Sequence, residues 1–261
     1  MASVDGEGGA VSEGAGTRDG QNVLLVHDRL RDAILRGEIA AGETASQVTL
    51  ARDLEVGRTP LREALRMLQR EGLVVSEPNR RVRIAGLSAA DMEAITVMRI
   101  GLETVAVRIT VPTLQSGQIA ELEGYMAQMD HFMRVGDTSG MRPAHRAFHQ
   151  LLVAGAGDRI AEMLGEWFDH AERYRLQYGA QTKAVWESRR AEHRRLLDAA
   201  AAGDAELASR RLAEHYAVTA GLVFAVLDQS YDPSRLRTAL ETVAPGTEAM
   251  LLDADALVAD P

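Results

Sequence analysis

Four histidines in the second half of the chain have a spacing that suits a metal site. His145 and His149 are four residues apart and share one face of a predicted helix. His193 and His215 fall on two later predicted helices, separated by a break at Gly203. Three helices of a bundle can bring these side chains to one interior point, where neutral imidazoles favour a transition metal over magnesium or calcium. The alternative is that they are surface histidines or hydrogen-bonded core side chains.

A second group of chemically suggestive side chains lies nearer the N-terminus, where arginines recur at helical spacing. Arg58, Arg62 and Arg66 follow one face of a predicted helix, while Leu61 and Leu65 belong to a different, apolar face. An arginine at the N-terminal end of such a helix can donate two hydrogen bonds to a guanine edge in the major groove of DNA. The alternative is that these arginines form a solvated helix face.

Further candidate contacts to nucleic acid surround this helix. Thr59 and the N–H groups at the helix start can hold a phosphate. Arg80 and Arg81, at the tip of a predicted hairpin, can enter a minor groove or contact phosphates. The candidate DNA-binding residues are Arg52, Arg58, Thr59, Arg62, Arg66, Arg80 and Arg81.

The elements that position these arginines occupy residues 22–86. Apolar residues at helical spacing predict a first helix that ends at Gly37, and Ser46 is a candidate N-cap for a short second helix. Thr59 and Pro60 are expected to open the third helix, with the threonine as cap. Two short apolar runs around a Pro-Asn turn then predict a β-hairpin. Three helices followed by a hairpin is the order of a winged helix-turn-helix.

The rest of the chain is predicted to be all-α. Residues 87–242 read as about six helices of an antiparallel bundle, beginning at a capping box formed by Ser88 and Asp91. Residues 1–21, rich in glycine and acid, are expected to be disordered. Residues 243–261 are expected to form an acidic C-terminal tail.

Composition limits the classes of protein that this chain can be. It has 261 residues, a net charge of −9 and no cysteine, which excludes disulfides and thiolate metal sites. It lacks a signal peptide and any apolar run long enough to span a bilayer, so we expect a soluble cytoplasmic protein. The acidic total argues against a nucleic-acid partner. However, residues 22–86 carry 11 arginines against nine acidic residues, which permits DNA binding.

The N-terminal region resembles the GntR family of transcription regulators. Residues 50–74 read L-A-R-D-L-E-V-G-R-T-P-L-R-E-A-L-R-M-L-Q-R-E-G-L-V, close to the family pattern L-A-x-x-L-x-V-S-R-T-P-V-R-E-A-L-x-x-L-x-x-E-G-L-V. The resemblance implies that Arg58 and Arg62 contact operator bases and that Thr59 contacts a phosphate. Two departures are Gly57 in place of the family serine and Arg81 in place of the glycine of the wing.

The helical region resembles the effector domain of the FadR subfamily, called FCD. The similarity rests on R-I-G-L-E at 99–103, A-F-H at 147–149, Glu192-His193 leading to Gly203-Asp204, and His215. Together with the head it covers roughly residues 22–230. In metal-binding members the ligands are an aspartate and three histidines, and His149, His193 and His215 match the histidine positions. His145 occupies the aspartate position, which implies a four-histidine site for a divalent transition metal such as zinc or nickel. The alternative is that His145 points elsewhere and a water or effector oxygen fills the fourth place.

The resemblance also implies a ligand and partners. Arg99, on the first helix of this region, needs an anionic partner if it is buried. That partner is either Glu103 or another bundle acid, or the carboxylate of an effector, since the subfamily commonly senses small carboxylic acids. Tyr174 and Arg175 are further candidate effector-binding residues. The resemblance further implies that the protein forms a homodimer, binds palindromic operator DNA and represses transcription.

Two other functions compete with this interpretation. One is a regulator of the same class that binds no metal and senses a larger apolar effector such as an acyl thioester. The other is a helical metalloenzyme in which the N-terminal region only docks the protein. The enzyme needs a positioned carboxylate base, and Glu192 beside His193 points about 100° away from it on a helix. We therefore expect no enzymatic activity.

Overall fold

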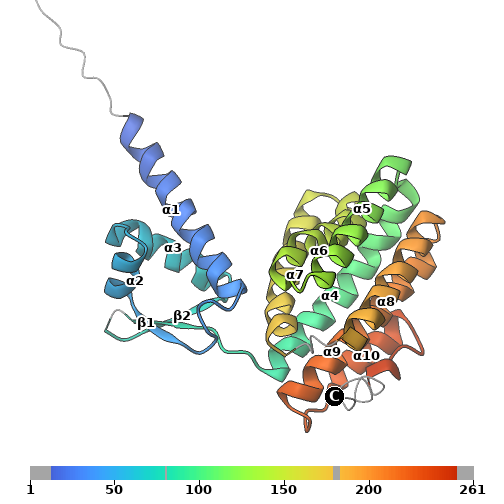
Figure 1. The fold of residues 1–261 in the computed structure, drawn as a ribbon. Coiled ribbons are helices and arrows are strands. Elements are labelled where there is room, and N and C mark those ends of the chain that lie inside the picture. The colour runs from blue at the N-terminus through green and yellow to red at the C-terminus, as the bar shows by residue number, and fades with distance from the viewer. Residues whose placement is uncertain (1–12, 80, 179–182, 252–261) are drawn as a thin grey trace, which may run out of the picture. The chain divides into compact units, whose positions relative to one another are not determined.

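A computed structural model describes residues 13–79, 81–178 and 183–251, and the chain divides after Gly86 into two compact units. The first unit holds three helices and a small sheet (Figure 1). Its elements are α1 (Glu13–Leu35), β1 (Thr44–Ser46), α2 (Gln47–Asp53), α3 (Arg58–Arg70), β2 (Val74–Glu77) and β3 (Arg81–Ile84). This order confirms the predicted winged helix-turn-helix.

The core of the first unit lies where α1 packs against α3. Val26 and Leu30 from α1 meet Leu61 and Leu68 from α3, and none of the four is more than 2% exposed. Ser46 caps α2 as expected, because its hydroxyl accepts a hydrogen bond from the N–H of Val48. The apolar stripe of α3 therefore faces inward and leaves the arginine face outward.

The sheet has one strand more than the sequence predicted. Its order is β1-β3-β2, and both pairings are antiparallel. The hairpin of β2 and β3 turns through Asn79, whose φ of 59° is a left-handed conformation that asparagine tolerates. Strand β1 was not predicted because its three residues, Thr44 to Ser46, have no apolar alternation; pairing with the open edge of β3 creates the strand.

Two predicted boundaries in this unit are wrong. Helix α1 begins at Glu13, so the expectation of disorder fails for residues 13–21. That segment contains no proline, and each residue added to an existing helix gains a hydrogen bond, although Gly14, Gly16 and Gly20 weaken this part of it. Helix α3 is capped by Gly57 rather than by Thr59. Pro60 then occupies the third helical position, where its missing N–H is harmless because the first turn lacks partners anyway.

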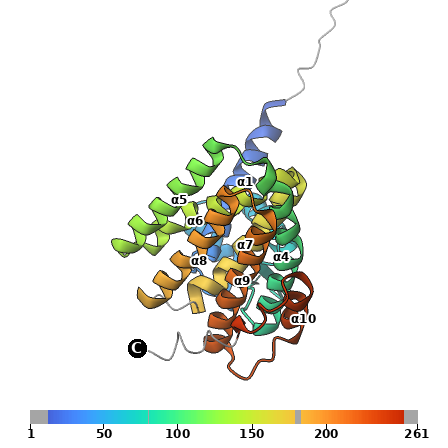
Figure 2. The same ribbon diagram turned by 90° about the vertical axis from the view of Figure 1, so that its right-hand side faces the viewer.

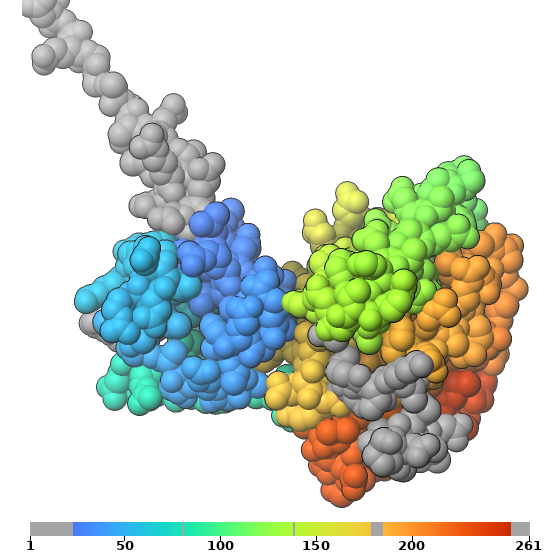
Figure 3. Space-filling model, viewed as in Figure 1, coloured from blue at the N-terminus to red at the C-terminus, as the bar shows by residue number. Residues whose placement is uncertain are grey.

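The second unit is all-helical. Its elements are α4 (Ala89–Thr110), η1 (Val111–Thr113), α5 (Ser116–Arg134), α6 (Thr138–Val153), η2 (Ala154–Ala156), α7 (Asp158–Tyr178), α8 (Lys183–Ala201), α9 (Ala205–Leu227) and α10 (Ser234–Val243). Helices α4 to α9 run alongside one another, and α4 contacts α6, α7, α9 and α10 (Figures 1 and 2). Helices α5, α6 and α8 share one outer face (Figure 3).

Glycine and aspartate set the register of the bundle at two turns. Gly136 and Gly203 end their helices with φ of 75° and 71°, a conformation that favours glycine. The residues that follow, Asp137 and Asp204, cap the next helices by accepting hydrogen bonds from backbone N–H groups. Helices α6 and α9, which carry three of the four candidate metal ligands, therefore start at fixed points.

Beyond α10, the chain folds back onto the bundle where a tail was expected. Thr247 and Leu251 are buried, and Leu251 belongs to the core cluster of the second unit. Residues 252–261 of the predicted tail lie outside the described residues. None of the helices in the described part of the chain is long and apolar enough to cross a membrane.

Candidate functional site

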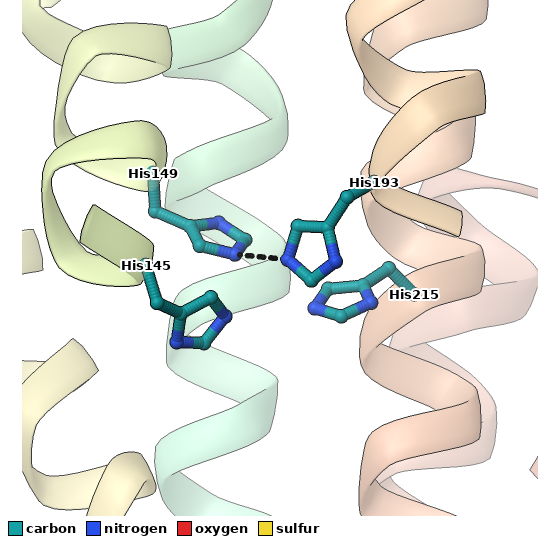
Figure 4. A group of neighbouring side chains, drawn as sticks. All are labelled: His145, His149, His193 and His215. Carbon is teal, nitrogen blue, oxygen red and sulfur yellow. Dashed lines mark hydrogen bonds between the residues drawn. The ribbon is translucent and has the colours of Figure 1, made fainter. Parts of the chain in front are cut away.

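The four predicted metal-binding histidines come together in the interior of the second unit. His145 and His149 project from α6, His193 from α8 and His215 from α9, and their rings face one another (Figure 4). One ring nitrogen of each lies within 4.8 Å of those of the other three. All four residues are buried, between 3% and 6% exposed. The structure thus brings together the four histidines that were selected from their spacing in the sequence.

Two of these rings are held by oxygen acceptors behind them. The Nδ1–H of His193 donates to the backbone carbonyl of Arg189 at 2.8 Å. Nδ1 of His215 lies 2.8 Å from a carboxylate oxygen of Glu192. A carbonyl or carboxylate can only accept, so both protons belong on Nδ1. Each Nε2 is therefore left with a lone pair, as a metal ligand requires.

The other two rings also have an oxygen near Nδ1. The hydroxyl of Tyr216 lies 3.4 Å from Nδ1 of His149 and donates its own proton to Glu103, so it is free to accept from the ring. Nδ1 of His145 lies 3.6 Å from a carboxylate oxygen of Glu172, which is too far for a hydrogen bond. Every histidine of the cluster thus turns Nδ1 toward an oxygen from the surrounding shell.

Burial keeps three of the four imidazoles, those of His145, His149 and His193, neutral. It lowers the pKa of His145 to about 4, and the nearby Glu172 carboxylate offsets this only in part. Burial also lowers the pKa of His149 and His193 well below the usual value, and repulsion from the neighbouring histidines adds to the effect. At neutral pH these imidazoles are uncharged, which is the form that coordinates a metal.

The donor set fits a metal ion. Nε2 of His149 and Nε2 of His193 are 3.3 Å apart, close to the separation of about 3.3 Å between two nitrogen ligands of tetrahedral zinc. Nδ1 of His145 has no hydrogen-bond partner among the described residues. Four nitrogen donors on three helices suit zinc or nickel better than magnesium or calcium.

A buried arginine network adjoins the cluster. Nε of Arg99 donates to Glu103 at 2.6 Å, and its Nη2 donates to the Tyr216 hydroxyl at 2.6 Å. Burial alone would lower the pKa of Arg99, but Glu103 and Tyr216 outweigh it and raise the pKa, so the guanidinium is charged. The sequence left two candidate partners for Arg99, an acidic residue of the bundle or the carboxylate of an effector. The structure shows the first of these, Glu103.

A cavity of about 30 Å³ lies between these groups. Its polar lining includes Arg99, Arg175, Thr219 and three of the four histidines, His145, His149 and His215. Arg175 from α7 pairs with Glu172 through both Nε, at 2.6 Å, and Nη2. A cavity of this size holds roughly two or three water molecules. It therefore suits a small polar ligand.

Tyr174, the remaining candidate effector residue, does not line this cavity. Its hydroxyl donates to Asp91 at 2.6 Å and accepts from the N–H of Ser88 at 3.2 Å. The predicted capping box at the start of α4 is therefore completed by a tyrosine, because the Asp91 carboxylate bonds to the hydroxyl of Tyr174. On α7 the side chains of Tyr174 and Arg175 point about 100° apart, so only one of them reaches the cavity.

Sequence reasoning missed most of the oxygens that hold the histidines. Glu172, Arg189 and Tyr216 were not selected, and Glu192 was considered only as a base beside His193. The only sequence signal was spacing on α8, because a carbonyl four residues before His193 can accept from its ring. The other oxygens come from neighbouring helices, so their positions depend on how the bundle packs.

The predicted DNA-binding residues that the structure describes are exposed. Arg58, Thr59 and Arg62 at the start of α3 line a hollow together with Gln47 and Val48 of α2. Among the described residues, neither Arg58 nor Arg62 has a hydrogen-bonded or ionic side-chain partner, so both guanidinium groups can meet a phosphate or a base. This hollow is the candidate nucleic-acid interface.

The other candidate arginines differ in whether an acidic side chain already pairs with them. Arg66 pairs with Glu63 at 2.7 Å and Arg52 pairs with Asp53 at 3.0 Å, both in exposed positions. Arg81 is exposed at the start of β3. Arg80 lies outside the described residues.

Two protein-family models match the two units. The model described as bacterial regulatory proteins, gntR family, matches residues 23–84. The FCD domain model matches residues 94–218, the range that contains all four histidines.

Individual relatives agree with these matches. A regulator of Agrobacterium vitis, named as an uncharacterized HTH-type transcriptional regulator in the TAR-I ttuE-ttuC' intergenic region, is 33% identical over 138 residues, 51% of this chain and 80% of that protein. A probable D-xylose utilization operon transcriptional repressor of Paenarthrobacter nicotinovorans is 28% identical to this chain. The match covers 74% of this chain and 84% of that protein. The solved structure of E. coli McbR/YncC has a TM-score of 0.71 and 22% identity over 81% of this chain and 99% of that chain, a likeness of fold.

Proposed function

Since the chain belongs to the gntR family of bacterial regulatory proteins and carries an FCD domain, it is a DNA-binding transcription regulator, and we propose that its helical unit binds a divalent transition metal and a small carboxylate effector. The effector changes the affinity of the head for operator DNA. An effector can do so only if it binds two arrangements of the protein with different affinity.

One observation carries the metal part of this proposal. All four histidines of the cluster turn Nδ1 toward an outer oxygen, and their remaining nitrogens converge. For His193 and His215, the short contacts at 2.8 Å fix the tautomer and orientation of the ring, as such oxygen acceptors do for metal-bound imidazoles. When bound, zinc or nickel supplies a Lewis-acidic cation that attracts a carboxylate oxygen.

The cavity supports a small carboxylate as the effector. Arg99 and Arg175 line it from two different helices, and both are charged donors with planar geometry that matches a carboxylate. Oγ1 of Thr219 in the same lining has no hydrogen-bond partner among the described residues. A cavity of about 30 Å³ is too small for an acyl thioester.

The head supplies the operator contacts in this proposal. Arg58 and Arg62 reach base edges, Thr59 and the start of α3 hold a phosphate, and Arg52, Arg66, Arg80 and Arg81 add contacts on either side. Because the P. nicotinovorans relative is named as a probable repressor, we expect this chain to repress transcription and to release DNA when the effector binds.

A homodimer suits palindromic DNA, and α4 offers a surface for it. Met98, Val105 and Ile109 lie on one face of α4 and are about half exposed. Gly101 lies on the same face, and a side chain there would meet only open space within the unit. Glycine in a helix interior is destabilising, and the close approach of a second α4 would account for it.

The test is a titration of the protein with its own promoter fragment, before and after removal of bound metal with a chelator. Small carboxylic acids are added singly to each preparation. We expect at least one acid to weaken DNA binding by the metal-loaded protein and to have little effect after chelation. Unchanged DNA binding with every acid in both preparations would contradict the proposal.

A further inference from the structure

A buried arginine beside the histidine cluster has side-chain N–H groups without a hydrogen-bond partner among the described residues. Arg189 is 5% exposed, and its Nε and Nη2 have no hydrogen-bond partner among the described residues. It lies on α8 one turn before His193, and its carbonyl holds the ring of that histidine. An unpaired guanidinium in the interior is costly, so buried arginines normally meet an anion.

The surroundings of Arg189 contain a second arginine and one shared carboxylate. Burial and the nearby Arg175 lower the pKa of Arg189 to about 10, which still leaves it charged at neutral pH. Glu172 and Glu192 oppose this shift, so both carboxylates lie close by. Glu172 already bonds to Arg175 through both of its oxygens, and Glu192 bonds to His215.

The charges around the cluster balance only while no metal is bound. Three guanidinium groups and three carboxylates surround the histidines: Arg99, Arg175, Arg189, Glu103, Glu172 and Glu192. A divalent metal on four neutral imidazoles adds two positive charges that no described side chain compensates. A monocarboxylate would compensate one of them, and a dicarboxylate would compensate both.

We propose that the effector is a short dicarboxylate. One carboxylate lies at the histidine cluster beside Arg99, and the other takes Arg175 away from Glu172. Glu172 then pairs with the unpartnered N–H groups of Arg189. Arg99 and Arg175 line the same cavity, so one small molecule can reach both.

This exchange of partners explains why a buried arginine stands at position 189. Arg189 receives Glu172 when the effector arrives, and the new pair joins α7 to α8 next to His193. The inference rests on the proposed function, because it concerns the second end of the same ligand.

The experiment compares matched acids on metal-loaded protein by calorimetry. The pairs are propionate with malonate, butyrate with succinate, and 2-hydroxybutyrate with malate. In at least one pair we expect the dicarboxylate to bind about 10- to 100-fold more tightly, as charge-assisted hydrogen bonds at a buried site imply. Arg189→Gln should reduce that preference to within about threefold, while Arg190→Gln should keep it, because Arg190 is exposed and pairs with Asp130.

A second measurement shows whether Arg189 is merely structural. Without effector, Arg189→Gln should melt at the same temperature as the natural chain or higher, since the change removes a buried guanidinium whose Nε and Nη2 have no hydrogen-bond partner among the described residues. A large fall in melting temperature would mean that Arg189 already has its partner and would overturn the proposal. Equal binding of both acids in every pair, or a preference that survives Arg189→Gln, would also overturn it.

The proposed function can survive that result. If monocarboxylates bind the metal-loaded protein and change operator affinity as strongly as dicarboxylates do, the regulator with a metal and a carboxylate effector stands and only the dicarboxylate fails. If neither kind of acid binds, both fail.

Discussion

Nδ1 of His215 on α9 lies 2.8 Å from a carboxylate oxygen of Glu192 on α8, and both residues are about 95% buried. The residue after Glu192 is His193, whose ring enters the same cluster from α8. A single turn of α8 thus supplies one candidate ligand directly and fixes another from behind. This arrangement makes Glu192 a positioning residue for the proposed metal.

Replacing Glu192 tests that role. Glu192→Gln removes the charged acceptor that holds Nδ1–H of His215, and we expect metal affinity to fall about 10- to 100-fold. Competition with a chromophoric chelator measures the affinity. Glu187→Gln, an exposed change on the same helix, should leave the affinity unchanged. Equal affinities in all three proteins would remove Glu192 from the site.

Acid should destabilise the metal-free protein. The pKa of His145 is lowered from its ordinary 6.5 to about 4 in the folded state. The unfolded chain therefore binds the proton first, and stability is lost as pH falls from about 6.5 to about 4, on the order of 3 kcal/mol for this group. Urea unfolding at a series of pH values measures the loss. His145→Ala should show a shallower decline, and an identical slope would contradict the assignment.

The two free arginines of α3 should dominate operator recognition. Arg62→Ala should weaken binding to the promoter fragment about 10- to 100-fold and relax its sequence preference, because a bidentate base contact is lost. Fluorescence anisotropy on promoter and scrambled DNA measures both effects. Arg70→Ala, at the far end of the same helix, is the matched control. A uniform loss on both DNAs would make Arg62 a phosphate contact.

Tyr174 should matter for stability and not for the effector. Tyr174→Phe deletes the hydroxyl that joins Ser88 and Asp91 at the start of α4, at a cost of about 1–3 kcal/mol for the groups left unpaired. Urea unfolding should detect this loss. Metal and carboxylate affinities should not change. Tyr125→Phe, a partly buried tyrosine elsewhere on the bundle, should alter neither property, and reduced effector affinity in Tyr174→Phe would return that residue to the site.

Local signals in the sequence account for much of the fold. The serine caps at Ser46 and Ser88 and the glycine break at Gly203 appear in the structure where the sequence suggests them. Strand β1 and the first turns of α1 were missed because neither has a hydrophobic pattern of its own. Both form through neighbouring structure, by pairing with β3 in one case and by extension of a packed helix in the other.

The candidate site divides in the same way. The spacing of His145 and His149 on one helix, with two later histidines and the resemblance to the FCD domain, selected all four ring donors. Glu172 and Tyr216 could not be selected, because their distances to the rings depend on the packing of α7 and α9 against α6. The sequence could not decide whether Arg99 pairs with an acidic residue of the bundle or with an effector carboxylate. Only the packed bundle shows that it contacts Glu103 and Tyr216.

The most direct test of the account is elemental analysis of the purified natural chain beside His149→Ala/His193→Ala, with His131→Ala as a control on an exposed histidine. We predict about one equivalent of zinc or nickel per chain in the natural protein and the control, and almost none in the double variant. Promoter binding, measured on the same preparations, should persist in all three. The absence of a transition metal from the natural chain, with promoter binding intact, would contradict the metal site while leaving the regulator in place.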